Sequence, residues 1–129
     1  MKYLIMITFV IGLAIADFVT GWIKAYIKND LSSRKMRIGG LHKLAEIIVM
    51  MTSCGVEFGI GLLGTYYQSD HLAAVSGAVA SGVVFGYITV MELISILENY
   101  AEINPDAAWA KSIIKRLRNI KQTEKKEES

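Results

Sequence analysis

The chain has 129 residues, of which 53% are apolar, and its formal net charge is +2. This length corresponds to one small domain, and a small soluble domain needs more polar surface than such a composition supplies. The charged residues gather at 24–43 and after Glu98, which leaves long runs almost free of charge. The composition therefore excludes an ordinary soluble domain and predicts an all-α integral membrane protein. Its single cysteine, Cys54, excludes an intramolecular disulfide and is expected to be a small core residue.

The basic segment 24–43 orients the rest of the chain. Six of the fourteen basic residues lie within it, between two long apolar runs. Cytoplasmic loops of membrane proteins carry an excess of lysine and arginine, so we expect this segment in the cytoplasm. Inside it, Asp30–Ser33 and Gly39-Gly40 are typical of turns.

The first apolar run covers residues 3–23. A bilayer core about 30 Å thick needs roughly 20 helical residues, so the run is long enough to span it. A cleaved signal peptide is the alternative, because Lys2 gives a basic start and Ala14–Ala16 has the small-x-small form of a cleavage site. Apolar residues continue past that site to Ile23, which favours a span with its N-terminus outside.

Two further runs, at 44–67 and 72–97, are also long enough to span a bilayer. The polar stretch Gln68–His71 between them is short and lacks lysine and arginine, which predicts an external hairpin with antiparallel helices. Three transmembrane helices then place the C-terminus in the cytoplasm. Residues 1–99 would form the membrane domain, and residues 100–129 a cytoplasmic helix and tail.

Three acidic residues fall inside the apolar runs: Asp17, Glu57 and Glu92. A charged side chain at the bilayer centre costs roughly 2.5–3.5 kcal/mol on insertion scales, so each needs a partner, a proton or water. Asp17 would reach the headgroup level or pair with Lys24 two helical turns away, or else it would make a polar contact between helices or face a pore. Glu57, near the middle of its run, would either be neutral and hydrogen-bonded to a neighbouring helix or line a wet surface, and the same wet role is open for Glu92.

Small residues recur at intervals of four in the second and third runs. Such spacing lets helix backbones approach closely in lipid. The pattern predicts packing faces that serve either an intramolecular hairpin or self-association between subunits. The candidate positions are Gly55, Gly59, Ala74, Ala78, Gly82 and Gly86.

The segment after residue 100 has a different composition. Asn104-Pro105-Asp106 is typical of a helix start, with asparagine as N-cap and proline in the first turn. The helix would continue to Lys121 as a basic amphipathic helix on an anionic membrane surface, or as a solvated helix packed on its own domain. Residues 122–129 are predicted to be disordered. The expected membrane contacts are Trp109, Lys111, Lys115, Arg118 and Lys121.

The sequence has no motif typical of catalysis. It lacks a nucleophile–base pair, a metal-binding cluster and a phosphate-binding glycine loop after a strand, and His42 has no second ligand at metal spacing. We therefore expect no enzyme activity and no cofactor or metal. Because the basic residues flank membrane spans, they indicate membrane lipids rather than nucleic acid. A transporter with three short spans would have few positions for a substrate, so a pore built from many copies fits better.

Two motifs resemble those of phage holins of the toxin-secretion and lysis type. The first is Asp17-x-x-Thr20-Gly21-x-x-Lys24-Ala25, followed by a basic loop with Gly40 and Lys43, and the second is Glu92-x-x-Ser95-Ile96-x-Glu98-Asn99. A proline and a basic C-terminal helix follow, although Asn104 stands where relatives often have glycine.

The resemblance covers nearly the whole chain and implies a holin. A holin forms homo-oligomers in the bacterial cytoplasmic membrane and permeabilises it, so that an endolysin reaches the cell wall or a toxin leaves the cell. The alternative is an antiholin, or a membrane anchor that recruits a partner through its basic C-terminal helix. The resemblance implies no catalytic residue and no cofactor.

Overall fold

The computed structural model describes residues 1–127, apart from 73–74 and 76–79, and consists of long helices. They are α1 (Lys2–Ile27), α2 (Ser33–Tyr66), α4 (Ala80–Ile103) and α5 (Ala108–Glu127). The residues that the structure describes are 89% helical and include no strand. Three of the helices, α1, α2 and α4, are long and apolar enough to cross a membrane. The predicted all-α membrane fold is confirmed.

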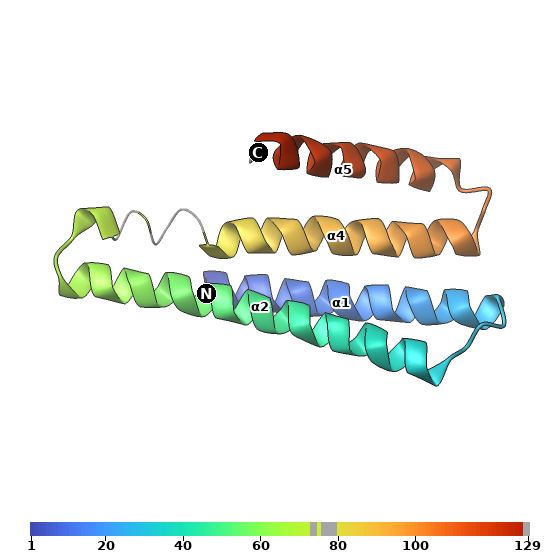
Figure 1. Ribbon diagram of the computed structural model, residues 1–129, viewed down its shortest axis with the longest axis horizontal. Coiled ribbons are helices and arrows are strands. Elements are labelled where there is room, and N and C mark those ends of the chain that lie inside the picture. The colour runs from blue at the N-terminus through green and yellow to red at the C-terminus, as the bar shows by residue number, and fades with distance from the viewer. Residues whose placement is uncertain (73–74, 76–79, 128–129) are drawn as a thin grey trace.

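The three long helices pack side by side with alternating direction. Helices α1 and α4 run the same way and α2 runs against them, as Figure 1 shows, and each of the three pairs is in contact. The α1–α2 loop and the α4–α5 connection consequently lie at the same end of the molecule, which we call the loop end. Helix α5 turns back and packs along α4 on the side away from α1 and α2.

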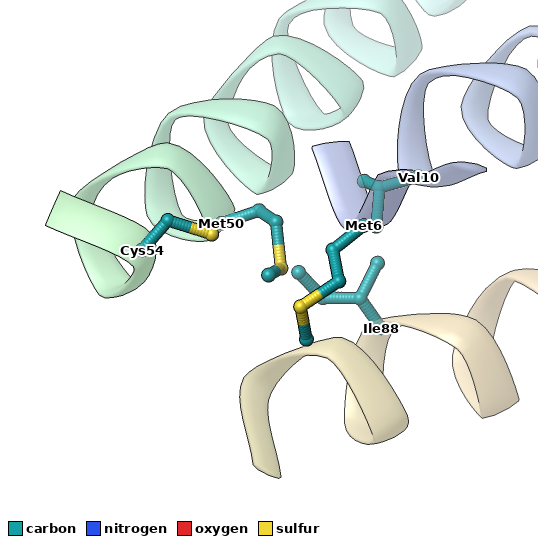
Figure 2. Packing of buried hydrophobic residues seen from close by; sticks show 5 residues of the cluster. All are labelled: Met6, Val10, Met50, Cys54 and Ile88. Carbon is teal, nitrogen blue, oxygen red and sulfur yellow. The ribbon is translucent and has the colours of Figure 1, made fainter. Parts of the chain in front are cut away.

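A small apolar core joins the three long helices. Met6 and Val10 from α1, Met50 and Cys54 from α2, and Ile88 from α4 meet there (Figure 2). Large apolar side chains such as Phe9, Val49 and Val83 instead point outward and are exposed. An exposed apolar surface of this extent would be unfavourable in water but suits contact with lipid.

Helix α2 begins earlier than the sequence pattern indicated. The hydroxyl of Ser32 caps it by accepting a hydrogen bond from the backbone N–H of Lys35 at 3.4 Å. Gly39 and Gly40 therefore lie inside a helix, and the predicted turn there is wrong. Glycine inside a helix costs only about 1 kcal/mol relative to alanine, which the packing of a long helix can offset. The loop is confined to residues 28–32, where Asn29 has a positive φ of 53°.

The short polar turn after the second run is present. Helix α2 ends at Tyr66, Gln68 takes a left-handed φ of 51°, and the chain is helical again at residues 70–72. The Ser69 hydroxyl caps this new helical turn by accepting a hydrogen bond from the N–H of Leu72 at 3.3 Å. The chain therefore becomes helical again where the third run was predicted to begin, although residues 73–74 and 76–79 lie outside the described part of the chain.

The junction between α4 and α5 also differs from the predicted one. Helix α4 continues to Ile103, and the N–H of Asn104 still donates to the carbonyl of Tyr100 at 2.8 Å. Asn104 thus closes α4 instead of capping the next helix. Residues 104–107 form a turn in which the N–H of Ala107 donates to the carbonyl of Asn104 at 3.1 Å, and α5 starts at Ala108. The helix start predicted at Asn104-Pro105 is therefore wrong by about one turn.

Candidate functional site

A buried ionic cluster centred on Lys43 connects the three long helices near the loop end. The Lys43 ammonium lies 2.7 Å from Asp17 of α1, 2.5 Å from Glu92 of α4 and 3.4 Å from Glu46, one turn along α2. The Lys43 side chain is only 19% exposed, and Glu92 is 1% exposed. We call Asp17, Lys43, Glu46 and Glu92 the Lys43 cluster.

Asp17 makes the inter-helix contact that was one of its predicted roles. Its predicted pairing with Lys24 is wrong, because Lys24 lies 3.5 Å from Glu102 of α4 instead. Two helical turns separate Asp17 and Lys24 by about 11 Å along the helix axis. A lysine on the neighbouring helix reaches Asp17 more closely than a lysine on its own helix does.

Asn99 extends the cluster toward the loop end. Its amide nitrogen donates to the Asp17 carboxylate at 3.0 Å and to the Thr20 hydroxyl at 3.2 Å. Gly21 lies beside this contact, and a Cβ added there would lie 3.5 Å from the Asn99 amide nitrogen, which is an ordinary contact distance. The resemblance included Asn99 and Thr20 as motif positions, but the residue pattern alone gave neither a role. Their contact joins two residues on different helices that lie 79 positions apart in the sequence.

The Lys43 cluster contains more carboxylates than cations. Three acids contact one lysine, and the Oε2 atoms of Glu46 and Glu92 are buried without a hydrogen-bond partner. A buried ion is strongly unfavourable when it is unpaired, and its pairing must offset the loss of water. The packing of the three helices at this level therefore depends on Lys43.

A second buried carboxylate, Glu57, lies toward the opposite end. It accepts hydrogen bonds from the Lys2 ammonium at 2.6 Å, the Tyr3 hydroxyl at 3.2 Å and the backbone N–H of Ser81 at 3.1 Å. The Ser81 hydroxyl also donates to it. Glu57 is 4% exposed whereas the Lys2 side chain is 54% exposed. We call Glu57, Lys2, Tyr3 and Ser81 the Glu57 cluster.

Glu57 lies beside the start of α1. Its contacts with Lys2 and Tyr3 set it level with the N-terminus of α1, and α2 continues beyond that level (Figure 1). At 1.5 Å per residue, the 34 residues of α2 reach about 51 Å, which is longer than a bilayer core, and the depth of Glu57 in a membrane stays a prediction. Both Glu57 and Glu92 contact neighbouring helices, and a water-lined role for either stays a prediction.

The small-residue positions have open surroundings. A Cβ added at Gly55, Gly59, Gly82 or Gly86 would meet nothing within 4 Å. At these four glycines the backbone is therefore not used for close packing within the chain, which disfavours the intramolecular alternative there. Ala74 and Ala78 lie outside the described residues.

The apolar side of helix α5 is partly buried and partly exposed. Ala107, just before it, together with Ala110 and Ile114, is buried, whereas Trp109 and Ile113 stay exposed. Trp109 contacts the ring of Tyr100 with centroids 5.5 Å apart. The exposed face, with Ile120 further along, is free for the predicted membrane contact.

The predicted basic contacts of α5 are divided. Arg118 pairs with Glu98 of α4, and the Lys111 ammonium donates to the carbonyl of Pro105 at 3.1 Å. Lys115 is exposed, and the side chain of Lys121 lies outside the described part. The contact with Glu98 fits the alternative of a helix packed on its own domain. Helix α5 can pack on α4 with one side and still present Trp109 and Ile113 to a membrane with the other.

The described residues contain no group of three or more histidine, cysteine, aspartate or glutamate side chains placed to hold a metal ion. The effect of the charged residues in these two clusters is to hold the three apolar helices together through ionic contacts that lipid cannot replace.

Three membrane-length helices with charged side chains turned inward and apolar side chains turned outward define a small helical integral membrane protein. The motif residues Asp17, Thr20, Lys43, Glu92 and Asn99 meet in one place within it. The chain belongs to the bacteriophage holin family, whose model matches residues 2–122. No curated protein and no solved structure matches the chain. Family membership confirms the resemblance and supports a membrane-permeabilising role.

Proposed function

We propose that this protein is a homo-oligomeric holin of the bacterial cytoplasmic membrane. Many copies would associate and open the membrane, which lets an endolysin reach the cell wall or a toxin leave the cell. Family membership and the three membrane-length helices support the membrane role. The open glycine faces are the observation that carries self-association.

The argument for self-association starts from what the glycines contact. Gly55 and Gly59 share one face of α2, and Gly82 and Gly86 share one face of α4. None of the four has a neighbouring atom within 4 Å of an added Cβ. In lipid, helices associate through close packing at small residues, because lipid tails leave no hydrophobic drive between apolar helices. A second copy of the chain is therefore the partner that these faces suit.

We further propose that the N-terminus lies outside and the C-terminus lies in the cytoplasm. The alternation of α1, α2 and α4 supports this, since it brings the basic segment 24–43 and the start of α5 to the same end (Figure 1). Both basic regions then satisfy the positive-inside rule. A reporter fused after Ser129 should be active only in its cytoplasmic form, and activity of an external reporter there would contradict the topology.

Substitution of an open glycine tests the oligomer. In Gly82→Leu the added Cβ meets no described atom of its own chain within 4 Å, and the leucine side chain fills the proposed contact face. We expect the variant to reach the membrane in normal amounts, to crosslink less between subunits, and to delay or abolish lysis of an expressing culture. Gly12→Leu is the matched control, because an added Cβ at Gly12 also meets nothing within 4 Å but lies on α1. Unchanged lysis timing in Gly82→Leu would contradict the assembly face.

The alternative function is an antiholin or a membrane anchor that recruits a partner through α5. The exposed face with Trp109 and Ile113, beside exposed basic residues, favours some contact of α5 outside the chain. Deletion of residues 105–129 separates the two functions. A holin should still depolarise the membrane after this deletion, whereas an anchor would lose its partner and would not depolarise the membrane in either form.

A further inference from the structure

A cavity of about 510 Å³ lies at the loop end between α1, α2 and α4. Its size falls within the usual range for sites that bind small molecules. Four lysines line it, namely Lys24 of α1, Lys28 just after α1, and Lys35 and Lys43 of α2, together with the carboxylates of Asp17, Asp30 and Glu102. The lysines outnumber the carboxylates by one, and this excess of positive charge favours an anionic ligand.

Two of these lysines share a single acid partner. Lys24 and Lys28 both pair with the same carboxylate, Glu102. Lys43 is engaged by the buried acids of its cluster, and Lys35 pairs with Asp30. The Glu102 side chain is 48% exposed, and exposed ion pairs of this kind contribute little. An anion can therefore take the place of Glu102 at a small cost.

The walls of the cavity indicate what kind of anion enters. Phe18, Trp22 and Met36 line it beside the lysines, and Gly39 lines it where an added Cβ would meet nothing within 4 Å. Trp22 and Tyr26 lie with ring centroids 6.3 Å apart, and both are exposed. Exposed aromatic rings at the end of a transmembrane helix mark the depth of the lipid headgroups. The cavity thus combines lysines with apolar walls at that depth.

We propose that this cavity binds the phosphate of an anionic phospholipid, with Lys24 and Lys28 donating to the phosphate and the apolar walls contacting the glycerol region. Basic pockets between transmembrane helices on the cytoplasmic side recognise anionic headgroups. The proposal rests on the membrane insertion and topology proposed above. A bound lipid at this site would join α1 to the first turns of α2 beside the Lys43 cluster.

Brominated lipids that quench tryptophan fluorescence test the site. The chain has two tryptophans, so Trp109→Phe leaves Trp22, which lines the cavity, as the single reporter. The protein is reconstituted in vesicles of phosphatidylcholine with a few per cent of brominated phosphatidylglycerol, and compared with brominated phosphatidylcholine at the same level. We expect quenching by phosphatidylglycerol to exceed that by phosphatidylcholine on the order of tenfold in relative affinity, as two lysines near the surface would give.

Two variants and a matched control make the result specific. Lys24→Gln with Lys28→Gln removes the phosphate donors, and Gly39→Leu fills the cavity without changing its charge. Both should abolish the preference for phosphatidylglycerol. Arg34→Gln with Arg37→Gln removes two exposed charges from the same end that do not line the cavity, and the preference should persist.

The proposal would be overturned by equal quenching by the two lipids, by a preference that survives both cavity variants, or by loss of the preference in the arginine control. Displacement of the lipid by millimolar inorganic phosphate would also overturn it, since the site would then take free phosphate. The same vesicles contain an entrapped dye, and its release measures permeabilisation in parallel with the quenching. A protein that binds the lipid without releasing dye would disprove the holin function and leave the lipid site standing.

Discussion

The Lys43 cluster and the Glu57 cluster both hold buried carboxylates between helices, and they lie toward opposite ends of the molecule. Each neutralises a buried carboxylate with a lysine from another helix. In the Lys43 cluster the lysine is itself mostly buried, whereas Lys2 of the Glu57 cluster is half exposed. The Glu57 carboxylate also has three neutral hydrogen-bond donors from Tyr3 and Ser81, whereas Asp17 of the Lys43 cluster has one, the Asn99 amide.

This difference indicates which end of the molecule is fixed and which can open. Removal of one partner from a buried ion pair leaves an uncompensated charge, which is far more costly than the loss of an exposed pair. The loop end, held by Lys43, should therefore stay assembled when the N-terminal end of α1 separates.

The largest effect is expected for Lys43→Met. The substitution keeps the length of the side chain but leaves Asp17, Glu46 and Glu92 without their common cation. We expect a loss of roughly 3–5 kcal/mol in the free energy of unfolding, measured by denaturant titration in mixed micelles. Adding Asp17→Asn and Glu92→Gln should restore part of the loss. If the triple variant is no more stable than Lys43→Met, the charge argument is wrong.

A smaller effect is expected for Asn99→Ala. The substitution removes the amide that donates to Asp17 and Thr20, while the ion pairs around Lys43 remain. Hydrogen bonds between membrane helices contribute about 0.6 kcal/mol on average and about 1.7 at most, so we expect a loss of about 1 kcal/mol in the same titration. Thr52→Ala serves as the control, since the Thr52 hydroxyl is exposed and donates only to the carbonyl of Ile48 in its own helix. Equal losses in the two variants would argue against the inter-helix contact.

Lys2→Met tests the other cluster and should have a smaller effect than Lys43→Met. Because Lys2 is half exposed and Glu57 keeps its contacts with Tyr3 and Ser81, the carboxylate is not left alone. Hydrogen exchange should rise in the first turns of α1 and stay unchanged near Asp17. Protection lost along the whole of α1 would show that the two ends are not independent.

The sequence predicted the helices well and their contacts poorly. Apolar runs between charged segments were enough to locate three membrane-length helices, because a bilayer imposes length and composition on each helix separately. The helix ends were less predictable. Gly39-Gly40 is typical of a turn, yet it lies within α2, since capping by Ser32 and packing of the long helix outweigh a local preference.

The partners of the buried acids required the fold. Nothing local to Asp17 indicates that Lys43 and Asn99 will reach it, because both contacts depend on how three helices align. Motif resemblance did gather Asp17, Lys43, Glu92 and Asn99 into one set without giving their contacts. Their meeting in space provides a physical reason for the two motifs to occur in the same chain.

The smallest effect belongs to an ion pair outside both clusters. Lys35 lies 2.7 Å from Asp30 in the α1–α2 loop, and its hydrogen bond lowers the pKa of Asp30 from the usual 3.8. Because the folded pKa is depressed, the contribution to stability is present above the usual pKa and disappears as the pH falls through the folded value. Both side chains are exposed, so the effect on unfolding should be slight and weaken with salt. Lys35→Gln should raise the pKa of Asp30 toward 3.8, as followed by the NMR shift of its carboxyl carbon, whereas Lys111→Gln, near Pro105, should not. An Asp30 pKa that stays low in Lys35→Gln would mean that another cation of the loop end, such as Lys24 or Lys28 of the cavity, lowers it instead.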